Sequence, residues 1–238
     1  MGREVELICR ERKHQITARY DIVQQDADIN ELSEDILKQS DVVIEFSLPG
    51  AVLENARLYA SAGIPAVVGT TGCEKDRAAV RSIVEEKGNG YIYGSNFSIG
   101  AHLFFRLVNS ASEMINSLPE YDILGYELHH RNKKDSPSGT ALAMAEGILQ
   151  HNQKKTKIIT EKLDRAPEQD ELHIASVRGG SIPGIHTVLM DSQADTIEIR
   201  HSARNRRGFA LGAVMAAEWV INKKGFYTVD DFINETLG

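Results

Sequence analysis

The segment Pro65-Ala-Val-Val-Gly-Thr-Thr-Gly72 is a short apolar run that ends in a turn of glycine and threonine. The apolar run predicts a buried strand, and the pattern after it predicts a helix from about residue 74 to residue 87. A strand, a turn and a helix in this order form half of a doubly wound unit, and ligands collect at the carboxyl ends of such strands. Gly69, Thr70 and Thr71 are therefore candidate nucleotide contacts, although a simple tight turn explains them equally well.

The same arrangement lies on both sides of this segment. Residues 41–46 are apolar enough for a buried parallel strand, and a helix opening at Pro49 and ending at Gly63 follows them. Residues 91–97 repeat the pattern of a strand and a turn, and another helix follows, to about residue 118. The alternation predicts an α/β fold whose first part is a Rossmann-like, doubly wound nucleotide domain.

The first 21 residues predict a helix and then a strand. Residues 1–13 have the pattern of an amphipathic helix, and residues 15–20 read as a strand that ends at Asp21. An acidic residue at the end of a second strand is where a dinucleotide fold binds the ribose hydroxyls of its cofactor. Asp21 is therefore a candidate cofactor contact, although an aspartate after a strand is more often a turn residue.

The segment from Tyr126 to Leu149 carries the chemistry. It reads YELHHRNKKDSPSGTALAMAEGIL, with apolar residues at helical spacing after Ser138. A helix that opens there presents unpaired backbone N–H groups around Gly139 and Thr140, which suit a carboxylate.

Two histidines and a lysine precede this helix. His129 and His130 lie where a predicted strand ends, and Lys133 follows them in the loop. Imidazoles supply a proton donor near neutral pH, and lysine supplies a fixed cation. Together with the helix start, these groups predict a dicarboxylate pocket that contains a general acid. The alternative is a solvated basic surface without a role in chemistry.

The run Glu127-Leu-His-His-Arg-Asn-Lys-Lys-Asp-Ser-Pro-Ser-Gly-Thr-Ala-Leu142 closely resembles the signature of the dihydrodipicolinate reductases, also called 4-hydroxy-tetrahydrodipicolinate reductases. Ser136 stands where alanine is usual in that family. The resemblance implies that His129 donates a proton, that Lys133 assists it, and that a small dicarboxylate substrate is bound by a further group of residues, namely His130, Gly139 and Thr140. It also implies NADH or NADPH as the cofactor.

The resemblance extends over nearly the whole chain. In the family, the turns that correspond to residues 69–72 and 96–100 line the nicotinamide, which implies further cofactor contacts at Gly94, Ser95, Asn96 and Phe97. Met1 corresponds to the tail of the family's glycine turn. We therefore expect that the first strand and the first two glycines are missing from this sequence, through an internal start or a truncation, and that NADH binding is weakened.

Beyond residue 120 the pattern changes to several strands without long helices between them. Residues 173–178, 184–190 and 196–201 read as strands of a mixed or antiparallel sheet, which predicts an α+β substrate domain. The expected boundaries are residues 1–97 with 208–238 for the nucleotide domain, and 98–207 for the substrate and oligomerisation domain. The resemblance implies a homotetramer built on this sheet.

Composition restricts the partners of the chain. The net charge of −7 argues against a nucleic-acid partner, and no apolar run is long enough for a membrane span. We see no signal peptide and expect a cytoplasmic protein. Two cysteines, Cys9 and Cys73, are too few for a disulfide framework or a zinc cluster, and no metal site is expected.

The function that the resemblance implies is reduction of 4-hydroxy-tetrahydrodipicolinate to tetrahydrodipicolinate in lysine and diaminopimelate biosynthesis. One alternative is a non-catalytic nucleotide-binding relative, which would have no need of the intact histidine, lysine and Ser-Gly-Thr set. Another is a different Rossmann dehydrogenase, for which the histidine pair would be unexplained. Tyr20-Asp21-Ile22 contains no arginine for a 2′-phosphate, which favours NADH.

Overall fold

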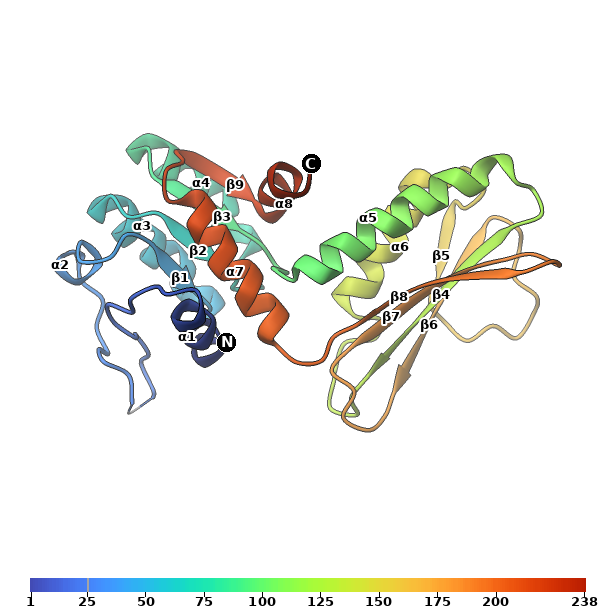
Figure 1. Cartoon of the computed structure of the whole chain (residues 1–238), viewed down its shortest axis with the longest axis horizontal. Coiled ribbons are helices and arrows are strands. Elements are labelled where there is room, and N and C mark those ends of the chain that lie inside the picture. Colours follow the sequence, from blue (N-terminus) through green and yellow to red (C-terminus); the bar gives the residue numbers. More distant parts are fainter. Residues whose placement is uncertain (25) are drawn as a thin grey trace. The chain divides into compact units, whose positions relative to one another are not determined.

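The computed structural model describes residues 1–24 and 26–238, and it divides into two compact units (Figure 1). Unit 1 comprises residues 1–99 and 206–238, and unit 2 comprises residues 100–205. Each unit has its own hydrophobic core. Among the described residues, no helix has both the length and the apolar character needed to cross a bilayer.

Unit 1 is built on a four-stranded sheet in the order β1-β2-β3-β9, in which every neighbouring pair is parallel. Its elements are α1 (Gly2–Glu11), α2 (Glu34–Leu37), β1 (Val43–Glu45), the 3₁₀ turn η1 (Pro49–Ala51), α3 (Val52–Ala62), β2 (Ala66–Val68), the 3₁₀ turn η2 (Glu74–Asp76), α4 (Arg77–Lys87), β3 (Gly90–Tyr93), α7 (Arg207–Val220), β9 (Gly225–Thr228) and α8 (Val229–Leu237). The strands and helices predicted between residues 41 and 97 are confirmed. Strand β9, which has only four residues, was not predicted from the sequence.

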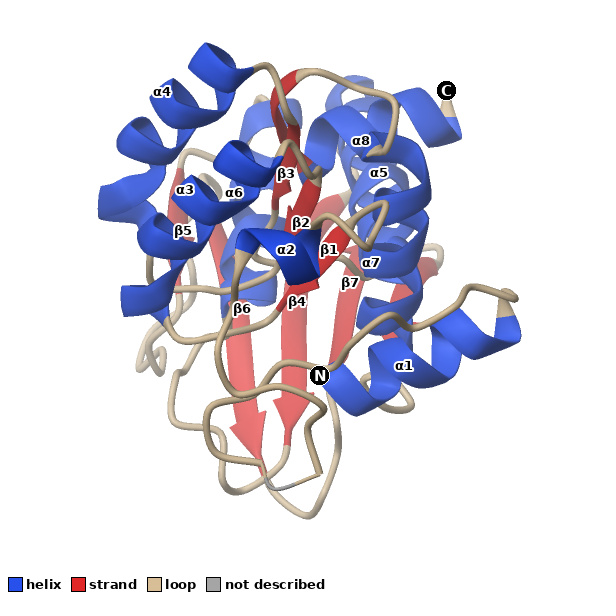
Figure 2. Ribbon diagram, turned by 90° about the vertical axis from the view of Figure 1, so that its left-hand side faces the viewer, coloured by secondary structure: helices blue, strands red, loops and turns tan. Residues whose placement is uncertain are grey.

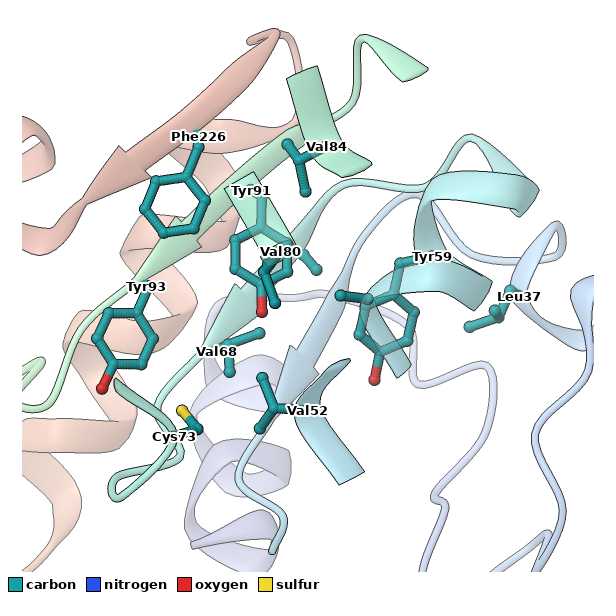
Figure 3. Close-up of a cluster of buried hydrophobic side chains, with 12 residues drawn as sticks. Leu37, Val52, Tyr59, Val68, Cys73, Val80, Val84, Tyr91, Tyr93 and Phe226 are labelled. Carbon is teal, nitrogen blue, oxygen red and sulfur yellow. The ribbon is translucent and has the colours of Figure 1, made fainter. Parts of the chain in front are cut away.

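Helices cover both faces of this sheet, which confirms the doubly wound prediction. Figure 2 shows α3 and α4 on one face and α7 with α8 on the other. In the first layer, Tyr91 stacks on Phe226 with ring centroids 5.5 Å apart (Figure 3). In the second layer, Val67 and Ile92 of the sheet pack against Ala213 of α7. Burial on both faces explains why these strands are almost wholly apolar in sequence.

The strand predicted at residues 15–20 is wrong. An isolated bridge between Tyr20 and Ile29 is the β-type pairing there, and α1 precedes it as expected. The reason is geometric: β1 is the end strand of the sheet, and a cavity of about 740 Å³ lies between residues 14–21, α1 and β1. An extended segment forms a strand only where a neighbour is close enough for ladder hydrogen bonds.

Unit 2 contains a five-stranded sheet in the order β5-β6-β4-β7-β8. Its elements are α5 (Ile99–Met114), the 3₁₀ turn η3 (Ile115–Ser117), β4 (Asp122–His129), α6 (Gly139–His151), β5 (Lys157–Ile159), β6 (Glu171–Arg178), β7 (Ile185–Asp191) and β8 (Thr196–Ser202). Strand β4 pairs in parallel with β6 and antiparallel with β7, so the predicted mixed sheet is confirmed. The short strand β5 was not predicted.

The helices α5 and α6 pack on one face of this sheet (Figure 1). Phe104 and Val108 of α5 and Met144 and Ile148 of α6 form the core with apolar residues of the strands. The opposite face has no helix among the described residues, and Leu124, Tyr126, Leu128 and Leu189 on it are half-buried. Unit 2 is thus a two-layer structure with one open sheet face.

Candidate active site

His129 is the last residue of β4 and is buried. Side chains alternate along a strand, and Ile123, Gly125, Glu127 and His129 all fall on the covered face of the sheet. Glu127 is therefore a carboxylate with 0% of its surface exposed, two residues before the histidine and on the same face. A buried charge of this kind requires partners.

Four residues other than His129 contact the Glu127 carboxylate. Oε1 accepts hydrogen bonds from the backbone N–H of Ser138 (2.9 Å), the hydroxyl of Ser176 (2.9 Å) and Nη2 of Arg178 (2.7 Å). The Ser138 hydroxyl donates to Oε2, and Nε2 of His186 lies 3.4 Å from the same oxygen. Burial raises the pKa of Glu127, but the hydrogen bonds from His186, Ser138 and Arg178 outweigh it and hold the pKa well below its ordinary value. The group is ionised.

Nδ1 of His129 lies 3.2 Å from Oε2 of Glu127, although the angle falls short of a full hydrogen bond. Its ring meets the ring of His186 edge-on, with centroids 5.2 Å apart. Burial lowers the pKa of His129 to about 4, and the positive groups of Lys133 and Arg178 act in the same direction. His129 is therefore a neutral imidazole at pH 7 in the ligand-free protein.

The helix start predicted after His130 is confirmed. Ser138 is the N-cap of α6, and its hydroxyl accepts a hydrogen bond from the Ala141 N–H at 3.1 Å. Because the same residue bonds to Glu127, the N-terminus of α6 is tied to the residue that contacts His129. Gly139 is exposed and Thr140 half-buried in the first turn, where backbone N–H groups face away from the helix.

His130 and Lys133 lie in the loop between β4 and α6, and both are half-buried. The Lys133 N–H donates to the His130 carbonyl at 3.1 Å, and Nζ of Lys133 lies 2.9 Å from Asp135. Lys133 is thus close enough to lower the pKa of His129, while its own charge is balanced by an aspartate. Unit 2 accordingly places the predicted substrate-side residues at one end of β4 and its connection to α6.

Glu127, His129 and His186 offer ligand atoms that lie within 4.8 Å of one another, which is a spacing compatible with a metal ion. However, Arg178 donates to the same carboxylate and places a positive charge beside it. A cation here would be repelled by the guanidinium and would have to compete with four hydrogen-bond donors. The donor set fits a hydrogen-bonded acid site better than a metal centre.

The groups that surround His129 were not predicted from the sequence. Glu127 lies in the segment that resembles the family signature, but no role is predicted for it, and Arg178 and His186 fall within the predicted strands 173–178 and 184–190. A signal for Glu127 was present: strand alternation placed a carboxylate on the same face as Ile123 and His129. The partners come from β6 and β7, and their arrival at one point depends on strand pairing that the sequence does not reveal.

In unit 1, the predicted cofactor residues follow neighbouring strands. Gly69, Thr70 and Thr71 come directly after β2, and Gly94, Ser95 and Asn96 come directly after β3. Because β2 and β3 are parallel neighbours, these turns lie at the same edge of the sheet. The Thr70 hydroxyl is already occupied, since it accepts the Ser47 N–H at 2.8 Å, whereas Thr71 is exposed.

Two residues of the second turn have structural roles. The Asn96 side chain accepts the Ser98 N–H at 2.8 Å, and Phe97 is 1% exposed in the core beneath α7. Gly212 of α7 lies against this turn so closely that a Cβ there would come within 1.7 Å of the Phe97 carbonyl oxygen. The turn is consequently held in a fixed position, with exposed Ser95 at its tip.

The N-terminal residues lie near the same edge. Met1 packs in one cluster with Ile44 and Phe46, which places the start of α1 near the carboxyl end of β1. Asp21 borders the 740 Å³ cavity, and its Oδ1 accepts the N–H groups of Val23 (2.8 Å) and Gln24 (3.0 Å). These bonds lower the pKa of Asp21 and show that its side chain stabilises a turn. Unit 1 therefore fits a dinucleotide.

Comparison with known proteins gives a consistent result over both units. The family model described as "Dihydrodipicolinate reductase, N-terminus" matches residues 1–97, and the model described as "Dihydrodipicolinate reductase, C-terminus" matches residues 100–233. A 4-hydroxy-tetrahydrodipicolinate reductase of Christiangramia forsetii is 40% identical over 235 residues, which cover 99% of this chain and 94% of the relative.

A reductase of the same description from Archaeoglobus fulgidus is 39% identical over 209 residues, covering 85% of this chain and 79% of the relative. Among solved structures, the dipicolinate-bound dihydrodipicolinate reductase of Paenisporosarcina sp. TG-14 superposes with a TM-score of 0.71. The match covers 95% of this chain and 92% of that chain at 22% identity. At this level of identity, the superposition shows a shared fold.

Proposed function

The chain belongs to the dihydrodipicolinate reductase family, and we propose that it catalyses NAD(P)H-dependent reduction of 4-hydroxy-tetrahydrodipicolinate to tetrahydrodipicolinate in lysine and diaminopimelate biosynthesis. The observation that carries the proposal is the buried contact between His129 and the Glu127 carboxylate, which is tied through Ser138 to the N-terminus of α6. This combination provides a proton donor beside a site for a carboxylate.

We assign cofactor binding to unit 1 and substrate binding to unit 2. When bound, NADH or NADPH supplies the hydride for the reduction. The turns at Gly69, Thr71 and Ser95 would hold the nicotinamide end, and the Asp21 carboxylate would hold a ribose. Met1 and the first turn of α1, which lie near the carboxyl end of β1, would offer backbone N–H groups to the phosphates.

In unit 2, the first-turn N–H groups at Gly139 and Thr140 would donate hydrogen bonds to one substrate carboxylate, and His130 would bind the other. Lys133 contributes a fixed positive charge between them. These groups bind the substrate in both its ground state and its transition state, and their main effect is on affinity.

His129 would supply the proton that the reduction consumes. It is neutral at pH 7 without substrate, because its pKa is about 4. A bound dianion brings negative charge next to the ring, which raises the pKa and lets His129 take up a proton when substrate binds. The protonated form of His129, which is the general acid, therefore forms when substrate binds.

One assay tests this function. The purified chain is given the product of the upstream synthase, and oxidation of NADH and NADPH is followed by absorbance. Turnover that requires both the synthase product and a reduced nicotinamide supports the proposal. Nucleotide binding without turnover would instead identify a non-catalytic relative, and turnover with an amino acid in place of the synthase product would identify another dehydrogenase.

We also propose a cytoplasmic homotetramer. The open face of the sheet in unit 2 carries half-buried Leu124, Tyr126, Leu128 and Leu189, together with Val177, which is 53% exposed. An apolar sheet face of this extent is stabilised when a second copy covers it. Light scattering should give four times the 26.3 kDa of one chain, and Leu189→Arg should reduce that mass. Cell fractionation tests the location.

A further inference from the structure

We propose that Glu127 is a positioning residue for His129: its buried carboxylate determines which ring nitrogen carries hydrogen and keeps the ring in place for proton transfer. This inference rests on the role of His129 proposed above. The exposed fraction of Glu127 is 0%, so its side chain is not accessible to a bound substrate. Its effect on the reaction would therefore pass entirely through the imidazole.

The first step of the argument concerns the tautomer. An ionised carboxylate accepts hydrogen bonds and has no hydrogen to donate. Oε2 of Glu127 lies 3.2 Å from Nδ1 of His129, so the favourable neutral tautomer carries its hydrogen on Nδ1. Nε2 is then the nitrogen with a free lone pair, which takes up the proton and passes it on.

The second step concerns the side of the ring that remains open. Nε2 of His129 points toward Gly184, where a Cβ would come within 3.0 Å of that nitrogen. The glycine therefore leaves room at Nε2 that any other residue would reduce. Nδ1 therefore faces the Glu127 carboxylate, whereas Nε2, which must exchange a proton, faces Gly184.

The third step concerns the rigidity of the carboxylate. Arg178, Ser176 and the Ser138 N–H hold Oε1, and Arg178 also donates to the Asp135 carbonyl at 2.7 Å. Glu127 is thus fixed by β6 and by the start of α6 at once. A carboxylate that is fixed by two elements can hold the neighbouring His129 ring in one orientation.

The fourth step concerns charge. The groups that act on His129 are Glu127 of the same strand, His186 of β7, Arg178 of β6 and Lys133 of the loop. The two cations and His186 oppose protonation of the ring, whereas the carboxylate favours it. Without the negative charge of Glu127, His129 would be harder to protonate in the substrate complex.

The experiment compares Glu127→Gln with the wild-type enzyme in the coupled assay across pH. At pH 7, kcat should fall by about tenfold to a hundredfold with KM changed by less than about twofold, and the limb on which kcat declines with rising pH should move to lower pH. The matched control is Glu171→Gln. Glu171 is a buried carboxylate on β6 that accepts a hydrogen bond from Arg165. It lies seven residues, or about 23 Å, along the strand from Arg178, the residue that pairs with His129. Glu171→Gln should leave the pH profile of kcat unchanged.

A second measurement does not depend on how Glu127→Gln folds. Nitrogen NMR of the wild-type imidazoles, with the His129 signals identified by their loss in His129→Gln, should show the neutral tautomer protonated on Nδ1. The opposite tautomer would overturn the positioning role, as would a Glu127→Gln enzyme with the wild-type kcat and pH profile. Absence of turnover in the wild-type enzyme would instead refute the proposed function, so the two failures are distinguishable.

Discussion

At the scale of single residues, the contribution of His129 can be separated from that of the carboxylate-binding groups. We expect His129→Gln to lower kcat by about a hundredfold or more with little change in KM, because a general acid acts mainly in the transition state. Steady-state kinetics of the coupled reaction measure both constants. An unchanged kcat would remove His129 from the reaction.

His130→Ala and Thr140→Val provide the matched comparison to that variant. They should raise KM more than they lower kcat, since the groups they remove bind carboxylates in the ground state and the transition state alike. If these variants instead lost kcat at constant KM, the roles of the two histidines would have to be exchanged.

The pKa of His129 also predicts how stability depends on pH. Its value of about 4 in the folded protein lies below the 6.5 of an exposed histidine. The unfolded chain therefore binds this proton more readily, and the stabilisation present above pH 6.5 is lost as the pH falls toward 4. The gap corresponds to about 3 kcal/mol. The lowered pKa of Glu127 acts in the same direction at still lower pH.

Urea unfolding at pH 7 and at pH 4.5 measures this loss. We expect the free energy of unfolding to decrease between the two values in the wild-type protein, and to decrease less in His129→Gln, which cannot take up the proton. An equal decrease in both proteins would show that His129 is not buried in its neutral form.

At the scale of elements, helix α7 packs closely on the turn after β3 at Gly212. A Cβ at Gly212 would lie 1.7 Å from a backbone oxygen, and that oxygen cannot turn aside as a side chain would. Gly212→Ala should therefore destabilise the protein by about 1–3 kcal/mol. Thermal unfolding measures the change.

Gly208→Ala, in the same helix, is the control for that substitution. Its Cβ would lie 3.5 Å from the Ser98 hydroxyl, an ordinary contact, and alanine favours the helix by up to about 1 kcal/mol. This variant should be neutral or slightly stabilising. A loss of stability of the same size in both variants would attribute the effect to α7 in general rather than to the contact with Phe97.

The elements that could be predicted from sequence are those whose signal is local. Residues close together in the chain predict strand β2 with its glycine turn, the N-cap Ser138 and strand β4. The strand expected at residues 15–20 failed because pairing depends on a neighbour, which the local pattern does not contain. In the same way His129 was found from its own segment, while Arg178 and His186 reach it only through the strand order of unit 2.

At the scale of the whole molecule, the two units should respond to different ligands. Pyridine-2,6-dicarboxylate, a planar analogue of the substrate, should slow amide hydrogen exchange mainly within residues 100–205. NADH should slow it mainly within residues 1–99 and 206–238, since bound ligands stabilise the part of the fold that holds them. Mass spectrometry of peptic fragments reports each region separately.

Salt provides a check on the dicarboxylate effect. The Lys133 and Lys134 charges attract the ligand over a distance that salt screens, so the protection should weaken as ionic strength rises. A benzoate control, with one carboxylate, should protect less at the same concentration. Equal protection by both acids would argue against recognition of two carboxylates.

Strand β9 pairs with β3, although more than a hundred residues of unit 2 separate them in the chain. During synthesis on the ribosome, unit 2 is complete before β9 emerges, and its contacts are contained within one continuous stretch. Until α7 and β9 have been synthesised, β3 of unit 1 has an unpaired edge. The inserted unit can therefore fold first, and closure of the nucleotide-binding sheet is the late, long-range step of biogenesis.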